Sequence, residues 1–188
     1  CRVIAKADWK DEIVIKTASA QVELEIRNFG TEEELRAQVA HDEAIYKDLY
    51  AKYGDSKNRD EYYLWQNANL KLLGSEDQLG YVLMRKKGVK ISMLDDAATA
   101  EIQAIRLGGT CVLGVPGEQF VEYGLYAKAM AGFGMIVYNT LTNGCLPGYM
   151  YPPESLVTGG YETDTSMLDV QFGRHLMDAI LHTADLVK

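Results

Sequence analysis

Residues 101–142 decide the fold, and they read EIQAIRLGGTCVLGVPGEQFVEYGLYAKAMAGFGMIVYNTLT. Two largely apolar segments, 101–107 and 111–115, flank the dipeptide Gly108-Gly109, which is the pattern of a two-residue hairpin turn between antiparallel strands. The segment 111–115 is apolar throughout, as expected of a strand that is covered on both faces. We therefore predict a β-hairpin whose second strand is buried.

The residues after this hairpin predict a βαβ unit. Pro116-Gly117 ends the second strand, a helix is expected at about 119–131, and Met135 to Thr142 supplies another strand. Connections of this kind place the two strands in parallel in one sheet. The fold class that follows is α/β, with a mixed sheet that contains a βαβ unit and flanking helices.

The N-terminal part predicts one further strand and a capped helix. Residues 12–27 alternate apolar and polar side chains at the two-residue period of a half-buried strand. Thr31 and Glu34 have the spacing of a capping box. An amphipathic surface helix is expected to begin there and to end at Gly54.

A second helix is expected at about 60–73, after a polar break. Its apolar side chains favour packing in a core over chemistry; they are Tyr62, Tyr63, Trp65, Leu70 and Leu73. The segment from Gly74 to Asp96 has a mixed pattern to which we assign no function. Within it, the basic run Arg85-Lys86-Lys87 is typical of a solvated turn.

The C-terminal part predicts a long loop and a final helix. The loop, 143–160, contains three prolines, and the helix is expected at about 168–187. Its apolar face is formed by Phe172, Leu176, Ile180 and Val187. Loops of this length without secondary structure are usually functional or disordered, and the prolines favour an ordered binding loop.

Composition excludes several classes of protein. The chain has 188 residues, the size of one domain or a large piece of one, and the longest apolar runs are far shorter than the roughly 20 residues of a transmembrane helix. The net charge of −8 would repel a phosphate backbone, so we expect no nucleic-acid partner. Three cysteines, Cys1, Cys111 and Cys145, show neither the spacing of a zinc finger nor that of a disulfide framework.

Glu118 is the first candidate for chemistry. It directly follows the predicted buried strand, where the loops of an open α/β sheet bind ligands. The expected helix would begin there, and its dipole would favour the ionised carboxylate. The pattern alone fits equally a metal ligand and a first-turn carboxylate that only complements the dipole.

Several segments of the chain resemble a known family in order and spacing. The resemblance runs through Ile105-Arg106-Leu107-Gly108, Val115-Pro116-Gly117-Glu118, Asn143, Tyr149 to Glu154, and Gly160-Tyr161-Glu162. These segments are similar to the C-terminal part of the neutral/alkaline ceramidase catalytic domain, specifically from about residue 100 onward. The whole chain, 1–188, is accordingly expected to be a C-terminal portion of a larger catalytic domain and an internal fragment, although a mature lipoprotein also begins with Cys.

The resemblance implies a zinc amidase site of which this chain holds half. In the family, zinc is bound by two histidines from the N-terminal part, a glutamate and a tyrosine, and the last two fall on Glu118 and Tyr149. A second family tyrosine contacts the substrate amide, and it falls on Tyr161. No segment of this sequence matches the motifs that carry the family's two histidine ligands and its catalytic serine. The three histidines of the chain, His41, His175 and His182, lie outside the matching segments.

Two functions from different classes follow. The first is zinc-dependent hydrolysis of ceramide or another N-acylated lipid by the complete protein. Its partner would be the N-terminal half of the same domain, and the isolated chain would be inactive. The second is a non-catalytic α/β domain that binds a ligand or partner.

The resemblance also suggests a secreted or cell-surface protein. His175 and His182, beside Asp178 and Asp185 on the last helix, are expected to form solvated pairs rather than a metal site.

Overall fold

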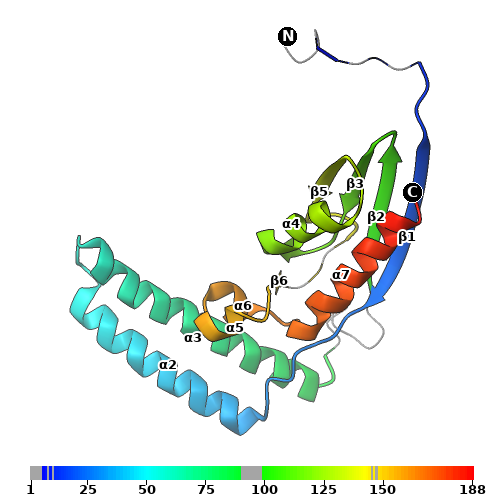
Figure 1. Cartoon of the computed structure of the whole chain (residues 1–188). Coiled ribbons are helices and arrows are strands. Elements are labelled where there is room, and N and C mark those ends of the chain that lie inside the picture. The colour runs from blue at the N-terminus through cyan, green and yellow to red at the C-terminus, as the bar shows by residue number, and fades with distance from the viewer. Residues whose placement is uncertain (1–5, 8, 10, 90–98, 145, 147) are drawn as a thin grey trace.

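The computed structural model describes residues 6, 7, 9, 11–89, 99–144, 146 and 148–188, and it consists of an α/β body and a helical arm (Figure 1). The strands of the body are β1 (Ile15–Glu23), β2 (Thr99–Leu107), β3 (Thr110–Gly114) and β5 (Met135–Asn139), with a separate pair β4 (Glu118–Gln119) and β6 (Tyr149–Met150). The helices are α2 (Glu32–Tyr53), α3 (Arg59–Lys86), α4 (Val121–Met130), α5 (Ser155–Thr158), α6 (Tyr161–Thr165) and α7 (Val170–Asp185).

The four-stranded sheet has the order β1-β2-β3-β5 and is mixed. β2 pairs antiparallel with both β1 and β3, whereas β3 and β5 are parallel. The hairpin turn closes on the pair Leu107 and Thr110, with Gly108 at a φ of +61° that favours glycine. The predicted hairpin, the βαβ unit and the α/β fold class are therefore confirmed.

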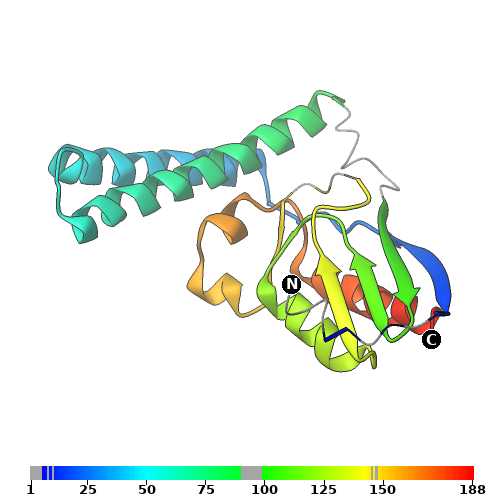
Figure 2. The same ribbon diagram turned by 90° about the horizontal axis from the view of Figure 1, so that it is seen from above.

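The core lies on one face of this sheet. Helices α4 and α7 both contribute to a single apolar cluster with the strands, and Figure 2 shows α7 along the sheet. Ile102, Leu113 and Phe172 are completely buried in the cluster. On the opposite face Val112 and Val137 are half-exposed. The expectation that β3 is covered on both faces is thus wrong for the described residues, because both body helices pack on the same side.

The final helix matches its prediction closely. The four residues of its predicted apolar face are all completely buried: Phe172, Leu176, Ile180 and Val187. By contrast, β1 is shorter than the predicted strand. The chain leaves the sheet after Glu23 and makes a single further bridge between Ile26 and Leu168.

The arm is an antiparallel pair of long helices that projects from the body in both views (Figures 1 and 2). The predicted capping box is present: the Glu34 backbone N–H donates to the Thr31 hydroxyl at 3.2 Å, and the Thr31 N–H donates to the Glu34 carboxylate at 2.8 Å. Gly54 caps the C-terminal end of α2 as predicted.

The second arm helix is twice as long as predicted. It continues through Gly74 to Lys86, so the basic run at 85–87 is exposed as expected but forms the last turn and the cap of α3. Basic side chains are favourable there because they complement the negative end of the helix dipole. Glycine at 74 serves a close packing contact, because a Cβ at this position would lie 2.8 Å from the Asp164 Cβ and carbonyl oxygen of α6. The part of the mixed segment at 90–96 lies outside the described residues.

The aromatic residues near the tip of the arm are not core residues. Tyr62 and Tyr63 remain 42% and 47% exposed, and Leu73 is 40% exposed. The rings pack edge-on against one another instead, with Trp65 in contact with Tyr50 and Tyr62. The expectation of core packing is therefore wrong for Tyr62, Tyr63 and Leu73, whereas Trp65 and Leu70 are half-buried.

Candidate functional site

The candidate site is built on the short parallel pair β4–β6, just beyond the ends of β3 and β5. Its two register pairs are Glu118 with Tyr149 and Gln119 with Met150. Side chains of residues that face each other across two strands lie on the same side of the pair. The backbone therefore places the Glu118 carboxylate next to the Tyr149 phenol, although 31 positions separate them in the chain.

A glycine and two side chains hold the β4–β6 pair in place. Gly117 has a φ of +76°, and a Cβ there would meet Leu146 Cδ2 at 2.7 Å and Met150 Cε at 2.8 Å. The buried Ser166 hydroxyl donates to the Tyr149 carbonyl at 2.7 Å. Gln119 accepts a hydrogen bond from the Tyr138 hydroxyl. These contacts fix the main chain at both candidate ligands.

Glu118 lies outside the following helix. Helix α4 begins at Val121 after its N-cap, Phe120, so Glu118 belongs to β4 and not to the first helical turn. The expectation that Glu118 lies at the start of the helix is wrong, because the helix begins three positions later. The interpretation of Glu118 as a dipole-complementing residue loses its geometric basis for the same reason.

The electrostatics of the site centre on Tyr149. A hydrogen bond with the Glu118 side chain is the main cause that raises the pKa of Tyr149 from the usual 10 to about 12, with burial as the second cause. The negative charge of Glu118 and the neighbouring Tyr161 and Glu162 add to this rise in pKa. At neutral pH Tyr149 is therefore a protonated hydrogen-bond donor.

Tyr161 and Glu162 complete the site from helix α6. The rings of Tyr149 and Tyr161 make an edge contact, with centroids 5.7 Å apart and planes at 69°. Glu162 lines the same cavity of about 330 Å³ as Glu118 and Tyr149. Glu162 was not predicted as a site residue. Its position directly after Tyr161 in the Gly-Tyr-Glu segment was the only available signal.

Helix α6 is fastened to the arm. The Gln78 side-chain amide donates to the Asp164 carbonyl at 2.6 Å, and the Arg27 guanidinium donates to the Thr163 carbonyl at 2.9 Å. Gly74 of α3 makes the close approach to Asp164 possible. Burial raises the pKa of the Asp164 carboxyl, and the nearby cations Lys71 and Arg27 partly oppose this rise. The arm and the segment before it thus hold α6, which carries Tyr161 and Glu162.

The histidines do not join this site. His41 is exposed on α2, and His182 is exposed on α7. His175 Nδ1 lies 2.6 Å from the Glu25 carboxylate, so the expected pair with Asp178 on the same helix is wrong for this residue. Over the residues that the structure describes, no group of three or more His, Cys, Asp or Glu side chains is arranged to hold a metal ion.

The cysteines offer no alternative ligand among the described residues. Cys111 is completely buried in the core, and burial raises the pKa of its thiol. Cys1 and Cys145 lie outside the described residues. None of the described helices is both long and apolar enough to cross a membrane.

The donor chemistry at β4–β6 fits part of a zinc site. A carboxylate oxygen is a common zinc ligand, and a phenol oxygen beside it can complete an oxygen pair on one ion. The Glu118 side chain is the main cause of the raised pKa of Tyr149, and both residues line one cavity, so the carboxylate and the phenol are close neighbours. Two ligands are fewer than the three or four protein ligands of known zinc centres, so a complete site needs further donors.

Comparisons with known proteins give a partial likeness in structure. No protein-family model and no curated protein matches the sequence. Two solved structures share part of the backbone: neutral ceramidase from Pseudomonas aeruginosa and a ceramidase complexed with C2, each at 19% identity and a TM-score of 0.42 over 46% of this chain. The chain spans only 15% and 14% of the length of these two proteins.

Proposed function

We propose that this chain supplies half of the active site of a zinc-dependent amide hydrolase, whose substrate is ceramide or another N-acylated lipid. The proposal combines the sequence resemblance to neutral ceramidases with one structural observation. Glu118 and Tyr149, which the resemblance selects as zinc ligands, are register partners that line the same cavity. Their proximity, across 31 positions of the chain, follows from the β4–β6 pair.

Glu118 and Tyr149 would hold the metal ion in this proposal. When bound, zinc would act as a Lewis acid on the amide carbonyl. Gly117 and Ser166 hold the backbone at Glu118 and Tyr149. Because the pKa of Tyr149 is about 12, its phenol has to lose a proton to an acceptor before it can bind as an anion. Tyr149 is therefore proposed as the weaker, labile ligand.

Tyr161 is proposed as the hydrogen-bond donor to the oxyanion that forms from the amide carbonyl. Its ring lies against that of Tyr149 and is held by α6. A fixed donor of this kind acts mainly in the transition state. The remaining ligands, two imidazoles, would come from an N-terminal half of the same catalytic domain.

Two variants of the complete protein test these roles. Tyr161→Phe should lower kcat by about 10² to 10³ and leave KM and zinc content nearly unchanged, a loss of roughly 3 to 4 kcal/mol. Glu118→Ala should lower zinc content and activity together, and excess zinc should restore part of the rate. Tyr63→Phe on the exposed arm is the matched control and should change neither.

The isolated chain provides an independent test. Calorimetric titration with zinc should detect no tight site, because Glu118 and Tyr149 supply two ligands only. A sub-micromolar affinity that Glu118→Ala abolishes would mean that the chain contains ligands beyond these two. If neither Tyr161→Phe nor Glu118→Ala alters amide hydrolysis by the complete protein, the non-catalytic ligand-binding domain is the better description.

A further inference from the structure

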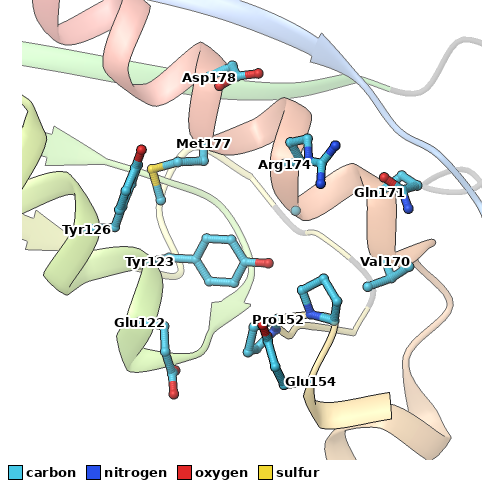
Figure 3. Close-up of a pocket in the computed structure, with 12 residues that line it drawn as sticks. Glu122, Tyr123, Tyr126, Pro152, Glu154, Val170, Gln171, Arg174, Met177 and Asp178 are labelled. Carbon is cyan, nitrogen blue, oxygen red and sulfur yellow. The ribbon is translucent and has the colours of Figure 1, made fainter. Parts of the chain in front are cut away.

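A cavity of the α/β body is separate from the β4–β6 site. It has a volume of about 440 Å³ and lies between α4, α7 and the segment 152–154 (Figure 3). None of its lining residues lines the cavity of Glu118 and Tyr149. Any ligand in it therefore makes contacts that the proposed amidase chemistry does not use.

Aromatic and aliphatic side chains form its walls. The Tyr123 ring crosses from α4 toward α7, and Met177 lies between it and the Tyr126 ring (Figure 3). Pro152 and Val170 close the end near α5. A concave surface of this kind binds the apolar part of a ligand.

The wall that Tyr123 forms is rigid. Its hydroxyl donates to the Tyr151 carbonyl at 3.0 Å, and the residue is only 8% exposed. The hydroxyl packs directly on the backbone of α7 at Gly173, where an added Cβ would lie 2.0 Å from it. The cavity is thus preformed, which lowers the entropic cost of binding.

The charges at the rim are unbalanced. Glu122, Glu154 and Asp178 carry three negative charges against the single positive charge of Arg174. Within the parts of the chain that the structure describes, these four side chains make no ion pair or side-chain hydrogen bond. Burial raises the pKa of Tyr123 to about 12, with smaller contributions from Tyr151 and from the nearby carboxylates of Glu122 and Glu154.

We propose that this cavity binds a small organic cation, an ammonium group carried on an aliphatic or arylalkyl body. The apolar body would lie against Tyr123, Tyr126 and Met177. The ammonium group would lie near Glu122 and Glu154, and the tyrosine rings add a favourable cation–π interaction. An anionic ligand of the same shape meets three carboxylates and is disfavoured. The proposal is independent of the proposed amidase function.

NMR titration of the 188-residue chain tests this inference with three probes of equal length: n-octylammonium, 1-octanol and octanoate. Octylammonium should shift the Met177 methyl and Gly173 amide signals saturably, with a dissociation constant of about a millimolar. Octanol should bind about three- to tenfold more weakly, and octanoate more weakly still. Raising the salt concentration should weaken octylammonium binding and leave octanol binding unchanged.

Charge variants show whether the rim is responsible. The double variant Glu122→Gln with Glu154→Gln should bind octylammonium no better than octanol, while its octanol affinity stays the same. The control, Glu33→Gln with Glu76→Gln on the arm, changes the net charge equally and should retain the preference. Tyr126→Leu, at a residue that is 49% exposed, should lower octylammonium affinity about two- to fivefold.

Three outcomes would overturn the proposal. They are equal affinity for octylammonium and octanol, equal effects of the two double variants, and saturable shifts confined to signals away from α4 and α7. If a variant fails to fold, the proposal is still tested by the effect of salt on octylammonium and octanol binding to the unmodified chain. Salt should weaken only octylammonium binding.

Discussion

The α/β body and the helical arm are stabilised in different ways. In the body, strands and helices share one core in which Phe172, Ile102 and Leu113 are completely buried. In the arm, the large apolar residues that reach comparable burial are Leu35, Leu72 and Tyr81. The arm therefore depends on helix capping, on packing between its two helices and on its contact with α6.

This difference divides the candidate site. Glu118 and Tyr149 belong to the body, where backbone pairing and core contacts fix them. Tyr161 and Glu162 belong to α6, which is fastened to the arm through Gly74 and Gln78. Substitutions in the body should mainly lower the free energy of unfolding. Substitutions at the junction of the arm and α6 should mainly change the position of Tyr161 and Glu162 relative to Glu118 and Tyr149.

The largest effect is expected from Phe172→Ala in the body. The side chain is completely buried under the sheet, so its loss leaves a cavity and should lower the free energy of unfolding by about 3 to 5 kcal/mol. Equilibrium urea denaturation followed by circular dichroism measures it. Tyr63→Ala on the arm removes an equally large aromatic side chain that is 47% exposed, and should cost about 1 kcal/mol or less. Similar losses for both would mean that the arm shares the core.

A pair of glycines on α3 tests the junction. Alanine normally stabilises a helix interior relative to glycine by about 0.5 to 1 kcal/mol. Gly80 faces open space, so Gly80→Ala should show this gain. At Gly74 the new methyl group would lie 2.8 Å from Asp164, so Gly74→Ala should instead destabilise by about 1 to 2 kcal/mol. It should also weaken the contact between the Tyr149 and Tyr161 rings, measured by nuclear Overhauser effects.

The test depends on whether Gly74→Ala and Gly80→Ala change the stability in opposite directions. If both substitutions stabilise the chain, α6 does not need the close approach at Gly74. If Gly74→Ala destabilises but leaves the Tyr149–Tyr161 contact intact, the arm supports α6 without positioning the site.

Local patterns predicted much of the fold. The hairpin, the βαβ unit, the capping box and the face of the last helix all depend on residues that are close in sequence, and these predictions are confirmed. The end of α3 was predicted wrongly because the pattern from Gly74 onward is mixed. Gly74 makes a close contact with Asp164, which joins residues 90 positions apart and has no local signal.

The site was predictable in part. The resemblance selected Glu118, Tyr149 and Tyr161, and the structure brings these three together. The β4–β6 pairing that brings Glu118 and Tyr149 together could not be predicted, because a two-residue strand such as β4 is too short to have a periodicity. Glu162 was missed because its approach to Glu118 depends on how α6 docks, which the arm determines.

The capping box should make a moderate contribution to the arm. Thr31→Ala removes the hydroxyl that accepts from the Glu34 N–H and leaves that donor without its capping partner. The expected loss is about 1 kcal/mol. Denaturation measures it, and hydrogen exchange should show faster exchange at the first turn of α2, with the body amides unchanged. Equally faster exchange in the body would show that the two regions unfold together.

The smallest effect concerns the pH dependence of the Glu118–Tyr149 pair. The hydrogen bond with Glu118 raises the folded-state pKa of Tyr149 to about 12, so the folded state favours the neutral phenol. The resulting stabilisation is fully present below about pH 10, and it is lost as the pH rises toward 12. NMR titration with ¹³Cζ-labelled tyrosine measures this pKa, and Tyr149→Phe identifies the signal.

Glu118→Gln removes the carboxylate charge, and the pKa of Tyr149 should then fall toward the usual 10. Gln78→Ala should release α6 and take Tyr161 and Glu162 away from Tyr149. Because these two residues are minor causes of the rise, the pKa should fall only slightly in that variant. A pKa near 10 in the unmodified chain would contradict the influence of Glu118 on Tyr149. A larger fall for Gln78→Ala than for Glu118→Gln would mean that the arm, rather than the body, controls the electrostatics of the site.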